Sequence, residues 1–311
     1  MEAKVEKLDA DTYMIDGYDL NLPERTGIYV LDAEELTIIE TGPSLSYPQI
    51  KAGLEQLGKT LADIRHIIVT HIHLDHSGGC GQLLKDIPNA TVHVHPSGKK
   101  HLVAPEKLVE GAKLVYGSSF HDLFDPVIPV PAERTNICED GDRLQIGTNH
   151  TLRFFDTPGH AFHHMSILDE HTNALFTGDT VGILYRGFRH EKLLVLPSTS
   201  PPQFDAANMK ESWKRIESLQ PATIYFGHFG GSGNIADIFQ STSEWLEKWI
   251  SLTKEVAAEE GGSGTLSERL YQSVRDAYKG LDENNPAWEA IKMDCHVSSL
   301  GLYQAYEKGR L

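Results

Sequence analysis

The stretch VTHIHLDHSGG, residues 69–79, places three histidines and an aspartate within six consecutive positions. It starts at the end of the apolar run IIV, which predicts a buried strand that ends where these side chains begin. In an extended segment residues two apart share a face, so we expect His71, His73 and Asp75 to converge while His76 turns aside. Imidazole nitrogens and carboxylate oxygens are ligands for Zn²⁺, iron or Mn²⁺. The following SGG is expected to open a helix with Ser77 as its cap.

Four more polar residues stand where other predicted strands end: Glu40 in IIETG, His160 in DTPGH, Asp179 in FTGD and His228 in YFGH. Each alone is a weak signal. Loops at strand ends on one edge of a sandwich are where sites form on rigid supports, so their joint placement favours a shared metal site. The chain has no G-x-S-x-G motif and no cysteine beside a convincing base, which agrees with water as the attacking group.

The pattern along the chain predicts a mixed α and β layered fold. Expected strands alternate with expected helices in two rounds, joined by a less regular connection at about residues 96–131, and a helical segment follows the second round. The strands are expected at 12–20, 26–31, 36–40, 66–70, 90–95, 138–147, 150–160, 164–170, 174–179 and 222–228, and helices at 48–59 and 206–219. We therefore predict a catalytic domain over residues 1–233 and a helical C-terminal extension over 234–311. In that extension Trp245, Leu246, Trp249 and Ile250 share one helix face, which is expected to cover its own domain.

Composition excludes several classes of partner. A formal net charge of −16 disfavours nucleic acid and anionic membrane surfaces. No apolar run approaches the roughly 20 residues that span a bilayer, and residues 1–15 lack a secretory pattern. Cys80, Cys138 and Cys295 stand far apart, which predicts neither a disulfide framework nor a thiolate zinc site. We expect a cytoplasmic protein with a small-molecule substrate, and a homodimer remains open.

In these motifs the chain resembles the metallo-β-lactamase superfamily of hydrolases, over roughly residues 10–235. The resemblance implies a four-layer αββα sandwich and a site with two divalent ions, zinc first and manganese or iron as alternatives. It implies that one ion is bound by His71, His73 and His160, the other by Asp75, His76 and His228, and that Asp179 bridges them. With a histidine at position 76 and an aspartate at position 179, the expected ligand set resembles that of the glyoxalase II and lactonase branches rather than that of the zinc β-lactamases. Glu40 stands where the family usually has aspartate.

Two such ions share a hydroxide and polarise a carbonyl or phosphoryl oxygen. The sequence therefore predicts a hydrolase that cleaves an ester, thioester or lactone through a metal-bridging hydroxide, with Asp75 and Asp179 as catalytic residues. For Asp75, the role of metal ligand is favoured over that of proton shuttle. Three alternatives remain: a phosphodiesterase, a persulfide-dioxygenase-like oxidoreductase with one iron on His71, His160 and Asp179, and a non-catalytic metal- or partner-binding protein.

Substrate contacts are expected from the loop after Asp179, where Tyr185, Arg186 and Arg189 suit an oxygen-rich or anionic substrate. Quorum-signal lactonases place a tyrosine three positions after the bridging aspartate, where this chain has Gly182. His163 and His164, beside His160, are expected to form hydrogen bonds in the core.

Overall fold

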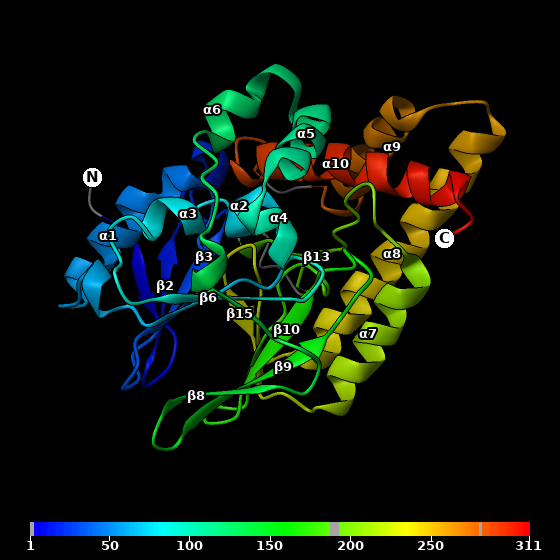
Figure 1. The fold of residues 1–311 in the computed structure, drawn as a ribbon. Coiled ribbons are helices and arrows are strands. Elements are labelled where there is room, and N and C mark those ends of the chain that lie inside the picture. Colours follow the sequence, from blue (N-terminus) through cyan, green and yellow to red (C-terminus); the bar gives the residue numbers. More distant parts are fainter. Residues whose placement is uncertain (1–2, 187–192, 280–281) are drawn as a thin grey trace. The chain divides into compact units, whose positions relative to one another are not determined.

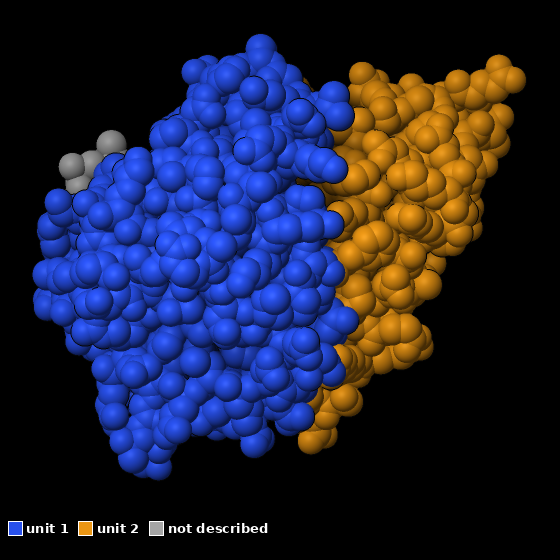
Figure 2. Space-filling view, viewed as in Figure 1, with its two compact units in different colours: residues 1–156, 163–178, 224–231 blue, residues 157–162, 179–223, 232–311 orange. Residues whose placement is uncertain are grey.

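A computed structural model describes residues 3–186, 193–279 and 282–311 (Figure 1). The chain divides into two compact units, coloured separately in Figure 2. Unit 1 comprises residues 1–156, 163–178 and 224–231, and unit 2 comprises 157–162, 179–223 and 232–311. The helices of the predicted C-terminal extension belong to unit 2, together with earlier segments of the chain. The domain boundary between residues 233 and 234 stays a prediction.

Unit 1 is built on a mixed sheet whose strands follow the order of the chain. These strands are β1 Val5–Lys7, β2 Thr12–Asp16, β3 Gly27–Leu31, β4 Thr37–Ile39, β5 His66–Ile68, β6 Thr91–Val94 and β7 Thr135–Ile137. The first four pair antiparallel, and β4 through β7 pair parallel. The parallel part brings the carboxyl ends of β4, β5 and β6 to one edge of the sheet, where the site is built.

A second sheet has the order β15-β14-β11-β10-β9-β8. Its strands are β8 Arg143–Gly147, β9 His150–Asp156, β10 Met165–Asp169, β11 Ala174–Phe176, β14 Thr223–Tyr225 and β15 Gly231–Ser232. An apolar layer joins the two sheets, with Tyr29 and Leu31 of β3 packed in one cluster with Phe154 and Phe176. Each such fully buried side chain stabilises the fold by about 1.5–3 kcal/mol.

Both faces of the first sheet are covered. Along β3, Ile28 and Val30 alternate with Tyr29 and Leu31 and join a second cluster with Ile50 of the α1 helix. This alternation places one row of side chains against the second sheet and the other against helices. The helices of unit 1 are α1 Tyr47–Gln56, α2 Leu74–Ser77, α3 Cys80–Leu83, α4 Lys99–Val103, α5 Glu106–Tyr116 and α6 Phe120–Phe124, with short 3₁₀ turns at Asp19–Asn21, Ser44–Ser46, Leu61–Asp63, Gly117–Ser119 and Ala132–Arg134.

The connection at residues 96–131 differs from the expectation. It holds the helices α4, α5 and α6. The helices α5 and α6 pack around a small cluster of Leu74, Phe120 and Phe124, whereas Leu102 of α4 joins the main core. The helices α4 and α6 have five residues each, and α5 has no fully buried residue, so none of the three shows the sustained apolar period that marks a helix in the sequence.

Unit 2 contains longer helices and a two-stranded sheet. Its helices are α7 Ala206–Ser218, α8 Ile235–Ala258, α9 Ser263–Ala277 and α10 Ala287–Glu307, and its sheet pairs β12 Ile183–Leu184 with β13 Val195–Leu196. Asp205 caps α7 by accepting from the Asn208 N–H at 3.0 Å. The predicted apolar face of α8 is buried, with Trp249 fully enclosed. Of the helices within the described ranges, none is long and apolar enough to cross a bilayer.

Candidate metal centre

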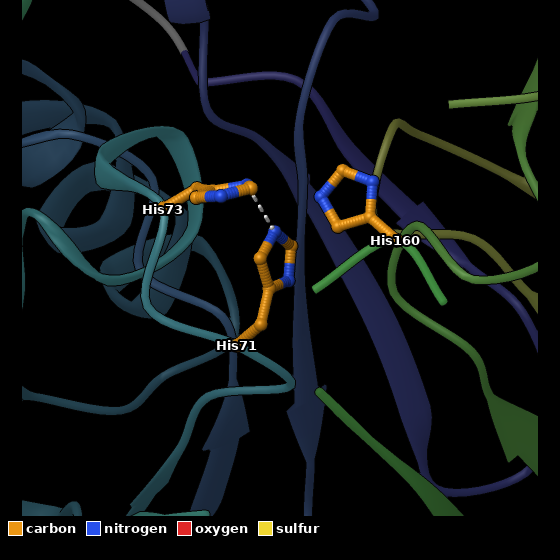
Figure 3. A group of neighbouring side chains, drawn as sticks. All are labelled: His71, His73 and His160. Atoms are coloured by element: carbon orange, nitrogen blue, oxygen red, sulfur yellow. Dashed lines mark hydrogen bonds between the residues drawn. The ribbon is translucent and has the colours of Figure 1, made fainter. Parts of the chain in front are cut away.

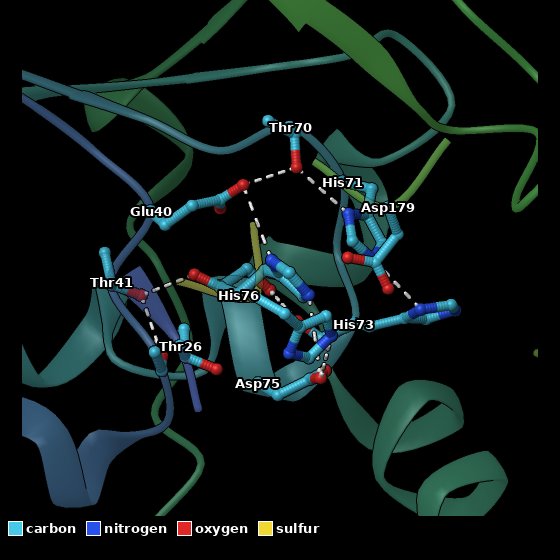
Figure 4. Close-up of polar contacts among 12 residues, drawn as sticks. Thr26, Glu40, Thr41, Thr70, His71, His73, Asp75, His76 and Asp179 are labelled. Atoms are coloured by element: carbon cyan, nitrogen blue, oxygen red, sulfur yellow. Dashed lines mark hydrogen bonds and ion pairs between the residues drawn. The ribbon is translucent and has the colours of Figure 1, made fainter. Parts of the chain in front are cut away.

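The ends of β4 and β5 carry the first part of the site. The two strands are parallel, with Ile39 opposite Ile68, so Glu40 follows one strand where the histidine-rich turn, residues 69–79, follows the other. The Glu40 N–H donates to the Ile68 carbonyl at 2.8 Å, and the Thr41 N–H donates to the His76 carbonyl at 2.8 Å. These bonds hold the end of β4 against the histidine-rich turn. Figure 4 shows Glu40 and Thr41 beside His76 of that turn.

The histidine-rich turn becomes helical earlier than the sequence suggests. His73 has extended backbone angles and α2 begins at Leu74, so the expected shared face ends at His73 and Asp75 lies on the helix instead. Ser77 is the last residue of α2 and does not cap a following helix, so the expected cap is wrong. Its Oγ donates back to the His73 carbonyl at 3.2 Å, because a hydroxyl inside a helix finds the carbonyl four residues earlier.

A chain of hydrogen bonds fixes the orientation of the His71 ring. The Thr70 hydroxyl donates to Glu40 Oε1, and Thr70 Oγ1 lies 3.0 Å from His71 Nδ1. A hydroxyl has one hydrogen, so the oxygen of Thr70 accepts from the His71 Nδ1–H. The proton therefore stays on Nδ1 and leaves Nε2 of His71 as a lone-pair donor, which is the state a metal ligand requires.

His73 stands beside that donor atom. His73 Nδ1 lies 3.0 Å from His71 Nε2 (Figure 3). Two nitrogens at this distance need a proton or a cation between them, and the fixed tautomer of His71 offers the lone pair to either. The donor chemistry of this pair therefore fits a divalent ion. His160, drawn in the same view, belongs to unit 2.

A second group of donors lies close by in unit 1. Donor atoms of Asp75, His76 and His228 lie within 4.8 Å of one another. Asp75 Oδ2 is 3.6 Å from His76 Nε2 and 3.7 Å from His228 Nε2. His228 Nδ1 donates to the carbonyl of Arg25 at 3.0 Å, which again leaves Nε2 as the free donor. The structure thus assembles the predicted Asp75, His76 and His228 set.

Glu40 links these two groups. Its Oε1 accepts from Thr70 and lies 3.4 Å from His76 Nδ1, and the residue is 1% exposed. Glu40, His71 and His76 form a further group whose donor atoms lie within 4.8 Å. Although glutamate is longer than the aspartate usual at this position, Glu40 still reaches the ligands of both groups and can help to position them.

Asp19 adds a carboxylate that sequence reasoning did not find. It is 1% exposed and lies on the 3₁₀ turn Asp19–Asn21. Burial raises the pKa of Asp19 to about 6, and the nearby negative charge of Asp75 acts in the same direction, while Arg25 and His228 oppose the shift. Asp19 therefore belongs to the electrostatic surroundings of the Asp75 group.

The remaining predicted ligands lie in unit 2 and contact each other. His160 Nε2 is 3.7 Å from Asp179 Oδ2, and both residues are buried. Ser198 contacts both of them. Its carbonyl accepts from His160 Nδ1 at 2.9 Å, and its hydroxyl donates to Asp179 Oδ2 at 3.0 Å. Ligands about 2.1 Å from a tetrahedral ion are roughly 3.4 Å apart, so the spacing of His160 and Asp179 suits a common ion.

The glycine of the FTGD motif is required by the close approach of two side chains. Gly178 has φ +47°, and a Cβ there would lie 2.6 Å from His164 Nε2 and overlap the Thr70 hydroxyl. His164 is fully buried, and its ring lies 5.0 Å from that of His71. His163 Nδ1 accepts from the Ile72 N–H at 3.5 Å. Both extra histidines therefore support the ligand histidines from the core.

The predicted substrate residues are placed in different ways. Tyr185 is 6% exposed and its hydroxyl donates to Asp294 of α10, so it has a packing role, and a substrate contact stays a prediction. Arg186 is half-buried. Arg189 lies outside the described residues. Gly182 has φ +109°, and a Cβ there would overlap the carbonyl of Leu196, so the backbone excludes a tyrosine at this position.

Besides Asp19, three residues that support the ligands were not identified from the sequence. Thr70 lies inside the histidine-rich turn, where its position before a ligand histidine is a usable signal. Arg25 and Ser198 each hold a histidine through a backbone carbonyl, and a carbonyl leaves no mark in the sequence.

A family model of the metallo-beta-lactamase superfamily matches residues 24–228, which include all seven predicted ligands. The chain belongs to this superfamily. A metallo-beta-lactamase fold-containing protein of Sulfurisphaera tokodaii is 29% identical over 85% of this chain and 94% of its own length. The superfamily fold confirms the expected sandwich with helices at its C-terminal end.

Solved structures show the same fold. An archaeal metallo-beta-lactamase superfamily protein from Sulfolobus tokodaii aligns with a TM-score of 0.67 and 26% identity, covering 95% of this chain and 99% of that protein. A metallo-beta-lactamase family protein of Thermus thermophilus aligns with a TM-score of 0.66 and 21% identity, covering 96% and 94% of the two chains.

Two further relatives carry an activity in their names. A hydroxyacylglutathione hydrolase of Rhodospirillum rubrum is 28% identical over 60% of this chain and 55% of its own length. An atrochrysone carboxyl ACP thioesterase of Aspergillus fumigatus is 26% identical over 58% of this chain and 36% of its own length. The chain spans only about half, or less, of each of these two relatives.

Proposed function

We propose that this superfamily member is a metal-dependent hydrolase with two divalent ions, which cleaves an ester, thioester or lactone with water as the nucleophile. The observation that carries the proposal is that unit 1 presents His71 with His73 and, separately, Asp75 with His76 and His228, while unit 2 presents His160 with Asp179. We propose that these three groups would supply the ligands of the two ions.

The protein's own residues hold the protons of the ligands in place. Thr70 keeps the Nδ1 proton of His71, and the carbonyls of Arg25 and Ser198 keep those of His228 and His160. When bound, two divalent ions supply Lewis acidity and lower the pKa of a water toward neutrality. Asp75 is 15% exposed at its side chain and is the carboxylate we assign to orient the attacking water and receive its proton.

The choice of acyl substrates rests on two features. The relatives include a thioesterase and a hydroxyacylglutathione hydrolase. The cysteines of this chain are free and buried, and burial raises the pKa of Cys80 and of Cys138 to about 12, which leaves them unsuited to attack a substrate. An acyl carbonyl attacked by activated water needs neither a thiolate nor a serine elbow.

Metal content tests the proposal first. We would purify the protein from metal-supplemented culture, measure metals per chain by elemental analysis, and compare His73→Ala and Asp179→Ala with His121→Ala and Asp122→Ala. The last two replace the same residue types on the exposed surface of α6. We expect close to two ions per chain in the controls and loss of at least one in each ligand variant. Unchanged metal content in both ligand variants would refute the ligand assignment.

Activity is then measured with an aryl ester, an acyl thioester followed by thiol release, a set of lactones, and an aryl phosphodiester. Hydrolysis of an acyl substrate that requires the metal supports the proposal, and hydrolysis of the phosphodiester alone replaces it with a phosphodiesterase. A single iron together with oxygen uptake on persulfides would establish the oxygenase alternative, and no retained metal in any preparation would favour the non-catalytic alternative.

A further inference from the structure

We propose that helix α10 and Ser198 position the metal ligands of unit 2, so that the C-terminal helices are part of the metal centre's support. The inference rests on the proposed metal site and concerns residues outside the seven ligands. All the contacts that carry it lie within unit 2.

Ser198 is a single support for two ligands. Its carbonyl oxygen and its hydroxyl hold His160 and Asp179 at 2.9 and 3.0 Å, and Ser198 itself is 5% exposed. The two ligand atoms, His160 Nε2 and Asp179 Oδ2, are 3.7 Å apart. A displacement of this one residue therefore changes the orientation of both ligands at once.

The segment that carries Ser198 is held by two helices. On one side, the hydroxyl of Ser241 in α8 accepts from the Val195 N–H at 3.1 Å and donates to the Val195 carbonyl at 3.2 Å. On the other side, the Thr199 hydroxyl donates to the carbonyl of Ser298 in α10 at 3.1 Å. Because a hydroxyl bond to a helix carbonyl leaves the helix ladder intact, α10 serves as a rigid anchor for residue 199.

Gly301 shows how close this packing is. A Cβ at position 301 would overlap the carbonyl oxygen of Thr199. The backbone of α10 thus lies directly against the residue that follows Ser198, and only glycine allows that approach. A methyl group at position 301 has to push residue 199 away, since the oxygen it meets belongs to the backbone.

The chain supplies a matched control. Gly264 lies in α9 of the same unit, and a Cβ there would meet nothing within 4 Å. Gly264→Ala and Gly301→Ala therefore make the same chemical change in two helices of unit 2, and only the second moves the segment that bears Ser198. Ser198→Ala removes only the bond to Asp179, because the carbonyl that holds His160 remains.

The experiment titrates metal-free protein with Co²⁺ and records the visible absorption spectrum and the dissociation constant. We expect Ser198→Ala and Gly301→Ala to change the cobalt spectrum and to weaken cobalt binding by about 10- to 100-fold, the usual effect of losing such a support. Ser198→Thr, which retains a hydroxyl, should recover most of the affinity. Gly264→Ala should match the unmutated protein in both readouts.

If Gly301→Ala fails to fold, Thr199→Val tests the same link, with Thr242→Val in α8 as its control. The Thr242 hydroxyl is buried and forms no hydrogen bond with the part of the chain that the structure describes, so its removal leaves the site intact. A cobalt spectrum and affinity equal to those of the unmutated protein in both Ser198→Ala and the α10-linked variant would overturn the inference while the proposed function stands. An unmutated protein that binds no cobalt would overturn both.

Discussion

Replacing Thr70 with valine tests whether the chain from Glu40 to His71 prepares the metal ligands. Valine has nearly the shape of threonine, and position 70 is 1% exposed, so packing is kept while the hydroxyl is lost. Glu40 loses a donor, and His71 Nδ1 loses the acceptor that fixes its tautomer. A hydrogen bond to a charged group contributes about 1.5–3 kcal/mol, which corresponds to roughly 10- to 100-fold in a binding constant. We expect zinc affinity to fall by that factor.

The matched control is Thr37→Val, at the opposite end of β4. Thr37 is also fully buried, and its hydroxyl donates to the Glu35 carbonyl at 2.8 Å, so Thr37→Val likewise removes a buried, hydrogen-bonded hydroxyl. Zinc affinity is measured by competition with a chromophoric chelator, and folding by thermal denaturation of the metal-free proteins. Both variants should lose some stability, but only Thr70→Val should lose zinc affinity. Equal zinc affinity in the two variants would refute the role of the Thr70 hydroxyl.

Other perturbations give further predictions. Gly178→Ala combines an unfavourable left-handed residue, about 1–2 kcal/mol, with overlap of Thr70 and His164, so both melting temperature and zinc affinity should fall. Trp249→Ala removes a fully buried side chain and should lower the free energy of unfolding by about 3–5 kcal/mol, measured by denaturant titration, with zinc stoichiometry unchanged. His150 forms a 3.0 Å bond with Asp169 that raises the pKa of His150. A raised pKa contributes stability that is present below about pH 6.5 and is lost as pH rises through the folded value, so His150→Gln should destabilise more at about pH 5 than at about pH 9. An equal loss of stability at both pH values would contradict the role given to His150. Chelation of the metal should lower the melting temperature of the unmutated protein, because an ion that binds only the folded state stabilises it. An unchanged melting temperature after chelation would contradict that prediction.

The sequence predicts those elements of the fold in which apolar residues recur with a helical period over several turns. The helix expected at 206–219 is observed at Ala206–Ser218, and the apolar face of α8 is buried as expected. Prediction failed where helices are short. The segments Lys99–Val103 and Phe120–Phe124 each make little more than one turn and depend on tertiary contacts, of Leu102 with the main core and of Phe120 and Phe124 with their own small cluster, which no local pattern contains.

The ligands themselves were predictable because metal chemistry requires particular side chains. His71, His73, Asp75 and His76 stand in one turn, and their types already indicate a metal site. The local geometry was not predictable, because the change from extended to helical backbone at Leu74 depends on how the turn packs against the end of β4.

The partners of the ligand histidines explain why a ligand set is easier to recognise than its support. Among the ligand histidines, the tautomer of His71 depends on a side chain, whereas those of His228 and His160 depend on the carbonyls of Arg25 and Ser198. Every residue has a carbonyl, so no substitution at position 25 or 198 removes these acceptors; only a shift of the backbone does. The orientation of His228 and His160 is therefore set by the packing of two loops. Variants that move those loops should disturb these two rings more than variants that alter the side chains at positions 25 and 198, whereas the Ser198 hydroxyl acts on Asp179.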